Sequence, residues 1–345
     1  MIAAGLRLPR CRSKAVRKTG KQGYDIMTKI GVLLPTRQGP DHGHVTATQT
    51  IAQAVMAEKL GFDSVWVGES VLARPRFDPI TTLAAVATQT SHVGLGTAIL
   101  MGPIHTPVLL AQRLATLDCL CEGRLTIGIG LGADTPGARR EYATAGIPYD
   151  QRLGRLIQTV QACRTLWRSD PEAMADDAPG RQTKYWDLRG VELYPKPFSN
   201  AGPQFWSSAS PFVEKALARV PRLYDGWLPN PPTAELFASG WQTISNSPDA
   251  ARPLTRAAYL TLCSDDDSAR ARTLLDRFCR DYYGYSVADG QKYQAFFGGN
   301  HAECIDWLKG YIAAGAEHIV LRIPDNDYTQ HLETLAQHIL PALHN

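Results

Sequence analysis

The sequence predicts an α/β protein folded as a (β/α)8 TIM barrel, and three observations lead to this fold class. Short β-branched runs alternate with longer helical patterns from residue 29 to the C-terminus. The runs are nearly continuous in Val, Ile and Leu, as expected of parallel strands buried on both faces. There are eight of them, each followed by a helical pattern. Eight right-handed βα units close naturally into a barrel, which can hold a chain of 345 residues.

The predicted strands are short, and that at residues 225–228 has the weakest pattern. They cover residues 29–34, 63–67, 93–98, 125–130, 204–208, 225–228, 254–263 and 318–323. Capping residues mark several helix ends: Gly61 ends the first helix, and Asp78 with Pro79 begins the second. The predicted helices cover residues 48–60, 79–90, 107–120, 135–145, 149–167, 211–219, 233–244, 267–282, 302–313 and 328–340.

Two segments interrupt this alternation. Residues 170–200 are rich in proline and charge, so we expect an insertion between strands four and five, with a short β excursion near residues 185–193. Residues 1–26 carry seven basic side chains and one acid, which predicts a basic disordered leader before a single domain at 27–345. A start codon assigned too early is the alternative, because Met27 directly precedes the first strand.

Composition excludes several classes of protein. The chain is 44% hydrophobic and 20% charged, which is typical of a globular protein with a large core. No apolar run approaches the ~18 residues of a membrane-spanning helix. The net charge of +3 comes from the leader, and the remaining chain carries −3, so we expect no nucleic-acid partner. Seven cysteines without a CxxC pair indicate reduced thiols and a cytoplasmic location.

A glycine-rich turn follows the fourth predicted strand. Residues 128–133 (GIGLGA) match the dinucleotide-binding pattern G-x-G-x-x-A, and Asp150 lies 20 residues after Gly130. The pattern sits on the fourth βα unit rather than the first, and the span to Asp150 is helical, which disfavours a Rossmann NAD dehydrogenase. In a barrel the glycines would let backbone approach a ligand at the C-terminal mouth, or simply allow tight packing.

Three segments carry a family likeness. They are residues 57–69 (AEKLGFDSVWVGE), residues 95–132 from LGTAIL to GIGLG, and residues 207–229 from SSASP to DGWLP. In order and spacing they resemble the bacterial luciferase-like family of flavin- and deazaflavin-dependent oxidoreductases. The resemblance implies a barrel that holds FMN, or alternatively the deazaflavin coenzyme F420, over the C-terminal ends of its strands.

The resemblance also implies cofactor-binding residues. Ala98 and Ile99 fall where many members have a non-proline cis peptide under the ring of the cofactor. The ring or its phosphate would be flanked by Gly130, Leu131 and Gly132, and the phosphate held by Ser207, Ser208, Ala209 and Ser210. A helix beginning at Pro211 would add free N–H groups for an anion, whereas plain helix capping by Ser208 or Ser210 is the alternative.

Two positions depart from the family pattern. Many members have a histidine after the acidic residue that follows strand two, but here Glu69 precedes Ser70. The deazaflavin sugar dehydrogenases have a glutamate after the fourth-strand glycines, where this chain has Ala133. The catalytic candidates are therefore Glu69, as an acid/base group or as a salt-bridge partner of nearby arginines, and His105, as a ring neighbour or a solvated loop residue.

These observations predict a flavin-dependent oxidoreductase, with the cofactor supplying the redox chemistry. Our first expectation is a monooxygenase that uses reduced FMN and oxygen on an unknown small organic substrate. Hydride transfer with F420 is the alternative, and a non-catalytic flavin-binding barrel is an alternative of another class. A separate flavin reductase and a second copy of the chain are the candidate protein partners. His42 and His44 lack an apparent third ligand, so we expect no metal.

Overall fold

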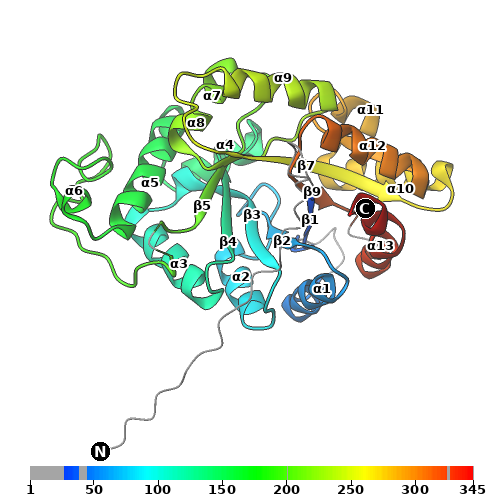
Figure 1. Cartoon of the computed structure of the whole chain (residues 1–345), viewed down its shortest axis with the longest axis horizontal. Coiled ribbons are helices and arrows are strands. Elements are labelled where there is room, and N and C mark those ends of the chain that lie inside the picture. Colours follow the sequence, from blue (N-terminus) through cyan, green and yellow to red (C-terminus); the bar gives the residue numbers. More distant parts are fainter. Residues whose placement is uncertain (1–26, 39–44, 200, 325–326, 345) are drawn as a thin grey trace, which may run out of the picture.

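A computed structural model of the chain describes residues 27–38, 45–199, 201–324 and 327–344. Its core is a closed barrel of eight parallel strands surrounded by helices (Figure 1). The barrel closes because β9 pairs with β1 on one side and with β7 on the other, and β7 also pairs with β6. The (β/α)8 prediction is therefore confirmed. The barrel strands are β1 (Lys29–Leu33), β2 (Ser64–Val67), β3 (Gly94–Met101), β4 (Leu125–Gly130), β5 (Gln204–Ser207), β6 (Gly226–Trp227), β7 (Thr255–Ser264) and β9 (His318–Arg322).

A ninth strand, β8 (Phe296–Gly299), is additional to the barrel and was not predicted. It pairs with the C-terminal part of β7, from Thr261 opposite Phe296 to Ser264 opposite Gly299. The ten residues of β7 therefore extend beyond the closed barrel. The sequence of β8 is FFGG, whose two glycines carry no β-branched pattern by which a strand could be recognised.

Most helices begin and end within a few residues of the predicted positions. In α1, for example, Thr46 and Gln49 form a capping box, and the carboxylate of Asp78 accepts the N–H of Thr81 at 2.7 Å at the start of α2. The α-helices are α1 (Ala47–Lys59), α2 (Pro79–Ala87), α3 (Pro107–Leu120), α4 (Pro136–Thr144), α5 (Arg152–Trp167), α6 (Pro171–Met174), α7 (Glu214–Leu217), α8 (Val220–Leu223), α9 (Ala234–Ser245), α10 (Ser268–Tyr283), α11 (Val287–Gly290), α12 (His301–Ala313), α13 (Tyr328–Thr334) and α14 (Leu340–Leu343).

The predicted helix at residues 211–219 is wrong in its start. Pro211 lies in a turn, and α7 begins three residues later at Glu214. The hydroxyl oxygens of Ser207 and Ser210 accept the N–H groups of the residues two positions ahead, at 3.2 and 3.3 Å. Such side-chain hydrogen bonds stabilise a turn in place of a helix, so the chain forms a turn here before α7 begins.

The predicted β excursion near residues 185–193 is also wrong. Between α5 and β5 the described chain contains the short helix α6 and no strand, only one isolated bridge between Gln182 and Asp187. The buried guanidinium of Arg181 donates to the carbonyls of Ala173, Leu188 and Val191 instead. One side chain thus satisfies backbone groups that a sheet would otherwise have paired. The leader and the His42/His44 pair lie outside the described residues.

Aromatic side chains fill the interior of the barrel toward the N-terminal ends of its strands. The rings of Trp66 and Trp206 lie 5.5 Å apart, and both pack against His318. Two glycines make room for them: a Cβ on Gly96 would lie 2.2 Å from the Trp66 ring, and one on Gly31 would lie 2.6 Å from its nitrogen. The interior of the barrel is therefore filled at the level of these rings.

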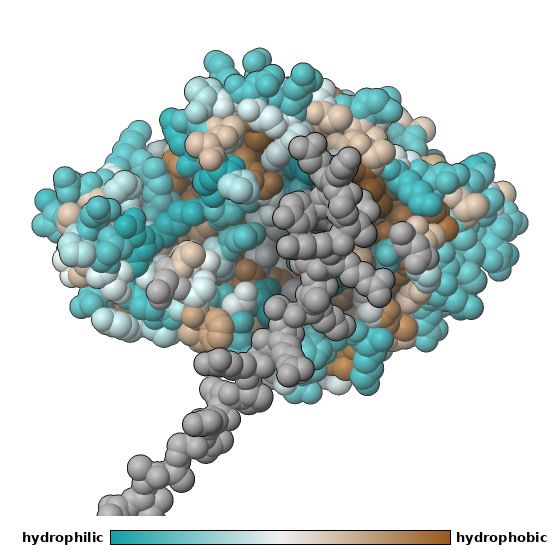
Figure 2. Space-filling model, viewed as in Figure 1, coloured by the Kyte–Doolittle hydropathy of each residue, from teal (hydrophilic) through white to brown (hydrophobic). Residues whose placement is uncertain are grey.

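The outer surface is mainly polar. Figure 2 shows hydrophilic residues over much of the periphery, with hydrophobic residues appearing chiefly in recesses between them. Among the residues that the structure describes, no helix is long and apolar enough to cross a membrane.

Candidate functional site

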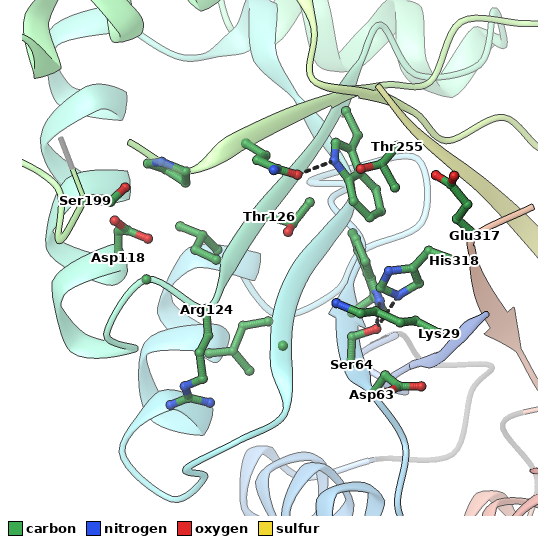
Figure 3. Close-up of a pocket in the computed structure, with 18 of the residues that line it drawn as sticks. Lys29, Asp63, Ser64, Asp118, Arg124, Thr126, Ser199, Thr255, Glu317 and His318 are labelled. Atoms are coloured by element: carbon green, nitrogen blue, oxygen red, sulfur yellow. Dashed lines mark hydrogen bonds between the residues drawn. The ribbon is translucent and has the colours of Figure 1, made fainter. Parts of the chain in front are cut away.

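A cavity of about 730 Å³ opens at the N-terminal ends of the strands (Figure 3). Lys29, Ser64, Thr255 and His318, the first residues of four strands, contribute to its lining. Ser64 and His318 face each other, with 2.7 Å between Oγ and Nε2. Burial, and secondarily the charge of Lys29, lowers the pKa of His318 to about 3, so the ring is neutral. Active sites of (β/α)8 barrels lie at the opposite end, and we interpret this pair as part of the barrel packing.

Two adjoining cavities occupy the C-terminal end. We call the first the mouth cavity; it measures about 430 Å³ and is lined by residues that follow or end the strands, among them Glu69, Ala98, Ile99 and Arg322. The second, the side cavity, measures about 380 Å³ and lies between the turns after β4 and β5 and the helix α5. Gly132 and Ser208 line both cavities. Together they form one bent cleft at the expected position.

Every predicted site residue except His105 lines one of these two cavities. Glu69, Ala98 and Ile99 line the mouth cavity. The side cavity is lined by Gly130, Leu131, Ser207, Ala209 and Ser210, together with the shared Gly132 and Ser208. Residues drawn from the ends of four strands are thus brought together, although their individual roles remain predictions.

The third strand is irregular where the cleft begins. The Ala98–Ile99 peptide is cis, as the family resemblance implied, and the register between β3 and β4 shifts between Thr97 and Leu100. The carbonyl of Ile99 accepts the N–H of Glu69 at 3.1 Å. The irregularity therefore sets the backbone from which the carboxylate of Glu69 projects.

Small residues keep the cleft open. A Cβ on Gly130 would lie 1.9 Å from Oγ of Ser208 and 3.1 Å from Cδ1 of Ile99. Gly132 has a φ of +71°, a conformation that L-residues rarely adopt. Within the described part of the chain, the Ser208 hydroxyl has no hydrogen-bond partner, so it is available to a ligand at the junction of the cavities.

Both carboxylate oxygens of Glu69 are hydrogen-bonded to neighbouring residues. Oε1 lies 2.9 Å from Nε2 of His105, and Oε2 accepts the N–H of Met101 at 2.6 Å. The Glu69 side chain is 5% exposed and that of His105 12%. The alternative salt bridge between Glu69 and an arginine is therefore not formed. His105 does not line the mouth cavity; it lies against Glu69, so its direct contact with a cofactor ring is not supported.

The loop after β2 is fastened from α4 by the buried Glu141. Its Oε1 accepts the hydroxyl of Ser70 at 2.7 Å and the N–H groups of Leu72 and Ala73 at 2.7 and 2.9 Å. Ser70, which stands where many family members have histidine, lines the mouth cavity, but its hydroxyl is bonded to Glu141. Sequence patterns did not indicate this contact, because 71 residues separate Ser70 from Glu141.

Several arginines line the cleft, and the sequence indicated a ligand-binding role for none of them; Arg74 and Arg76 were considered only as salt-bridge partners of Glu69. Arg152 and Arg219 line the side cavity, and Arg74, Arg76 and Arg322 line the mouth cavity. One signal was available: Arg322 is a charged residue at the end of the apolar run HIVLRI and is 7% exposed. A buried charge at the C-terminal end of a barrel strand is typical of a binding site.

Comparisons with known proteins agree with this geometry. The family described as luciferase-like monooxygenase matches residues 28–318. An F420-dependent glucose-6-phosphate dehydrogenase of Amycolatopsis mediterranei is 24% identical over 326 residues, which cover 85% of this chain and 93% of that protein. A protein of the same name from Beutenbergia cavernae is 26% identical, over 85% of this chain and 92% of its own length.

Solved structures share the fold. Monooxygenase RslO1 from Streptomyces bottropensis superposes with a TM-score of 0.75 at 20% identity, covering 91% of this chain and 99% of that one. The oxygenating constituent of 3,6-diketocamphane monooxygenase from Pseudomonas putida, in complex with FMN, gives a TM-score of 0.68 at 18% identity, covering 91% and 98%.

Proposed function

Since this chain belongs to the luciferase-like monooxygenase family, we propose that it is an oxidoreductase that holds F420 in the bent cleft and exchanges hydride with a small organic substrate. The proposal rests on two cavities that adjoin at Gly132 and Ser208. The mouth cavity lies beside the irregularity at Ala98–Ile99, and the side cavity is lined by two arginines. A ring with a phosphate-bearing tail needs such a pair of compartments. We expected FMN first from the sequence, and the full-length relatives named F420-dependent move our preference to F420.

The side cavity suits the phosphate of the coenzyme. Arg152 and Arg219 bring two positive charges, and they donate to neutral groups, the carbonyls of Tyr149 and Lys215, at 2.7 and 2.6 Å. Ser208 supplies a hydroxyl at the junction that is bonded to none of the described residues. Guanidinium and hydroxyl groups are the donors that phosphate prefers. Since α7 begins only at Glu214, we assign phosphate binding to these side chains rather than to a helix start at Pro211.

The mouth cavity suits the ring and the substrate. F420, when bound, supplies a carbon centre that accepts or donates hydride. Glu69 is the one acidic side chain among the described residues that line this cavity, so it would take up or return the accompanying proton at a carboxylate oxygen. His105 would fix that carboxylate through Oε1. Trp66 and Trp206 pack in one cluster with Ala98, which lines the mouth cavity, and they would shield the floor of this cavity from water.

FMN-dependent monooxygenation is the second candidate, supported by the FMN-bound structural neighbour. The same compartments would hold FMN, with its phosphate in the side cavity. We do not propose glucose 6-phosphate as the substrate, because Ala133 replaces the glutamate that the sugar dehydrogenases carry after the fourth strand.

Titration of the purified chain with F420 and with FMN, followed by absorbance and fluorescence, tests the proposal. We expect saturable F420 binding and FMN binding at least about tenfold weaker. Arg152→Gln should weaken F420 binding by about tenfold or more, because a charge-assisted hydrogen bond is lost. The matched control Arg113→Gln removes an exposed arginine from α3 and should leave the affinity unchanged. Tighter FMN binding would favour the second candidate, and binding of neither coenzyme would overturn both.

A further inference from the structure

The mouth cavity carries an excess of positive charge. Among its described lining residues, Arg74, Arg76 and Arg322 are basic and Glu69 is acidic. Both oxygens of Glu69 are already engaged, by His105 and by the N–H of Met101. Among the described ion pairs, Glu69 pairs with His105 and not with Arg74 or Arg76, so these two guanidinium groups keep their charge in the cavity.

Arg74 and Arg76 contact neutral partners. Arg74 donates from Nε to the carbonyl of Tyr282 at 3.1 Å, and Arg76 donates from Nη2 to the hydroxyl of Tyr282 at 2.5 Å. Arg74 also lies over the rings of Tyr282 and Tyr283, at 5.5 and 5.0 Å from their centroids. In the described part of the chain, neither arginine has an acidic side chain within ion-pairing distance. Neutral partners orient a guanidinium without cancelling its charge.

The two guanidinium groups are held in place before any ligand binds. Glu141 fastens the loop that carries them through the backbone of Leu72 and Ala73. A backbone bridge joins Arg76 to Arg37, and Nη1 of Arg76 lies 2.7 Å from the position that a Cβ on Gly68 would occupy. Arg76 therefore lies against the backbone of Gly68, next to the Ala98 carbonyl. Preorganised guanidinium forks bind carboxylate or phosphate with little loss of entropy.

We propose that Arg74 and Arg76 form an anion subsite, and that the substrate of this chain therefore carries a carboxylate or a phosphate group. The inference rests on the proposed function, because it assigns the mouth cavity to substrate and the side cavity to coenzyme. The coenzyme's own phosphate is the other source of an anion. Arg152 and Arg219 already provide a separate cationic compartment for it, on the other side of Gly132 and Ser208.

Inorganic phosphate is the probe, added to the chain loaded with F420 and measured by calorimetry. We expect saturable binding that weakens at least about tenfold in the double variant Arg74→Gln/Arg76→Gln, because two charge-assisted contacts are lost. The control Arg113→Gln should bind phosphate like the wild type. F420 affinity, measured separately by fluorescence, should change less than about threefold in the double variant.

Each other outcome overturns the proposal. Equal losses of phosphate and F420 affinity in the double variant would assign the arginines to the coenzyme. Phosphate binding that is absent, or that the double variant does not weaken, would show that they form no anion subsite. If the double variant unfolds, Arg76→Lys keeps the charge but loses the fork, and unchanged phosphate affinity there would equally refute bidentate recognition.

Failure of the proposed function has a different signature. In that case wild-type chain does not bind F420, and phosphate is titrated against the coenzyme-free chain instead. In the Arg152→Gln background, phosphate binding in the side cavity is removed, and the remaining affinity comes from the mouth cavity. Adding Arg74→Gln/Arg76→Gln to this background should weaken that remaining phosphate affinity. No further weakening would overturn the subsite independently of the coenzyme.

Discussion

Replacing Glu69 by glutamine should separate its chemical role from its structural one. The glutamine amide oxygen can accept the N–H of Met101, which now donates to Oε2 at 2.6 Å. Its NH2 group can donate to Nε2 of His105, which lies 2.9 Å from Oε1, when the ring carries its proton on Nδ1. The change therefore keeps both contacts and removes the negative charge and the basic oxygen.

The magnitudes follow from these contacts. Glu69→Ala leaves a buried N–H and a buried ring nitrogen without partners, which should lower the free energy of unfolding by about 3–5 kcal/mol. At the usual entropy of unfolding per residue, this corresponds to a fall in melting temperature of roughly 4–7 °C. Glu69→Gln should cost less than about 1.5 kcal/mol, because only the charge assistance is lost. If Glu69 moves the proton, kcat/KM should nevertheless fall by about 10²–10⁴.

The assay combines melting temperature, F420 affinity and single-turnover reduction of F420 by a substrate found in a screen of alcohols that carry a carboxylate or phosphate. Glu172→Gln is the matched control, because this carboxylate is 90% exposed and lies outside the cleft. A folded Glu69→Gln variant with normal F420 affinity and turnover within about twofold of wild type would refute the proton-transfer role and leave Glu69 a structural residue.

Three further perturbations test other parts of the molecule. Burial depresses the pKa of His318 from 6.5 to about 3, so the stability that its neutral ring provides is complete above about pH 6.5 and is lost as pH falls toward 3. Between pH 7 and pH 5, the free energy of unfolding of the wild type should therefore fall by about 2 kcal/mol more than that of His318→Gln. An equal pH dependence of the two unfolding free energies would contradict this. Glu141→Ala leaves the two loop N–H groups and the Ser70 hydroxyl without their acceptor, so the free energy of unfolding, measured with denaturant, should fall by about 2–4 kcal/mol. A fall below about 1 kcal/mol would mean that water takes the place of the carboxylate as acceptor. Gly132→Val places a side chain in the cleft and should weaken F420 binding at least about tenfold. Gly146→Val is the control, because its φ of +70° matches the +71° of Gly132 while a Cβ there has no neighbour within 4 Å. Equal F420 affinity in the two variants would show that Gly132 does not belong to the site.

The barrel could be predicted because its strands are buried on both faces. Runs such as KIGVL in β1 and HIVLR in β9 are apolar except at their ends, and this pattern does not depend on distant parts of the chain. The same rule could not find β8, whose FFGG sequence is a strand only because the extended end of β7 offers it a partner. It also could not place the start of α7, where the side chains of Ser207 and Ser210 compete for backbone N–H groups.

The candidate site was predicted in part, and the missing part has a common cause. Ala98, Ile99 and Gly132 lie in motifs whose spacing along the chain is fixed, so a family resemblance could indicate them. Arg76 and Tyr282 meet only because α10 ends beside the loop after β2, 206 residues away in sequence. No local pattern encodes such a contact. The positive charge of the mouth cavity arises from residues that only the closed barrel brings together.

Glycines in the strands of this barrel serve two opposite purposes, and the side chain that faces each one decides which. A Cβ on Gly226 would lie 2.6 Å from the ring of Trp206, just as Gly96 faces Trp66, so these glycines are filled by neighbours and pack the barrel. At the other end, Gly130 faces the small Ser208 and the end of the Ile99 side chain, and Gly132 faces the flexible end of Met101. Glycines opposite tryptophan make room for the rings that fill the barrel interior, and glycines opposite small or flexible side chains leave space at the C-terminal end. The glycine pattern alone therefore could not distinguish packing from binding, whereas the residues across the barrel do.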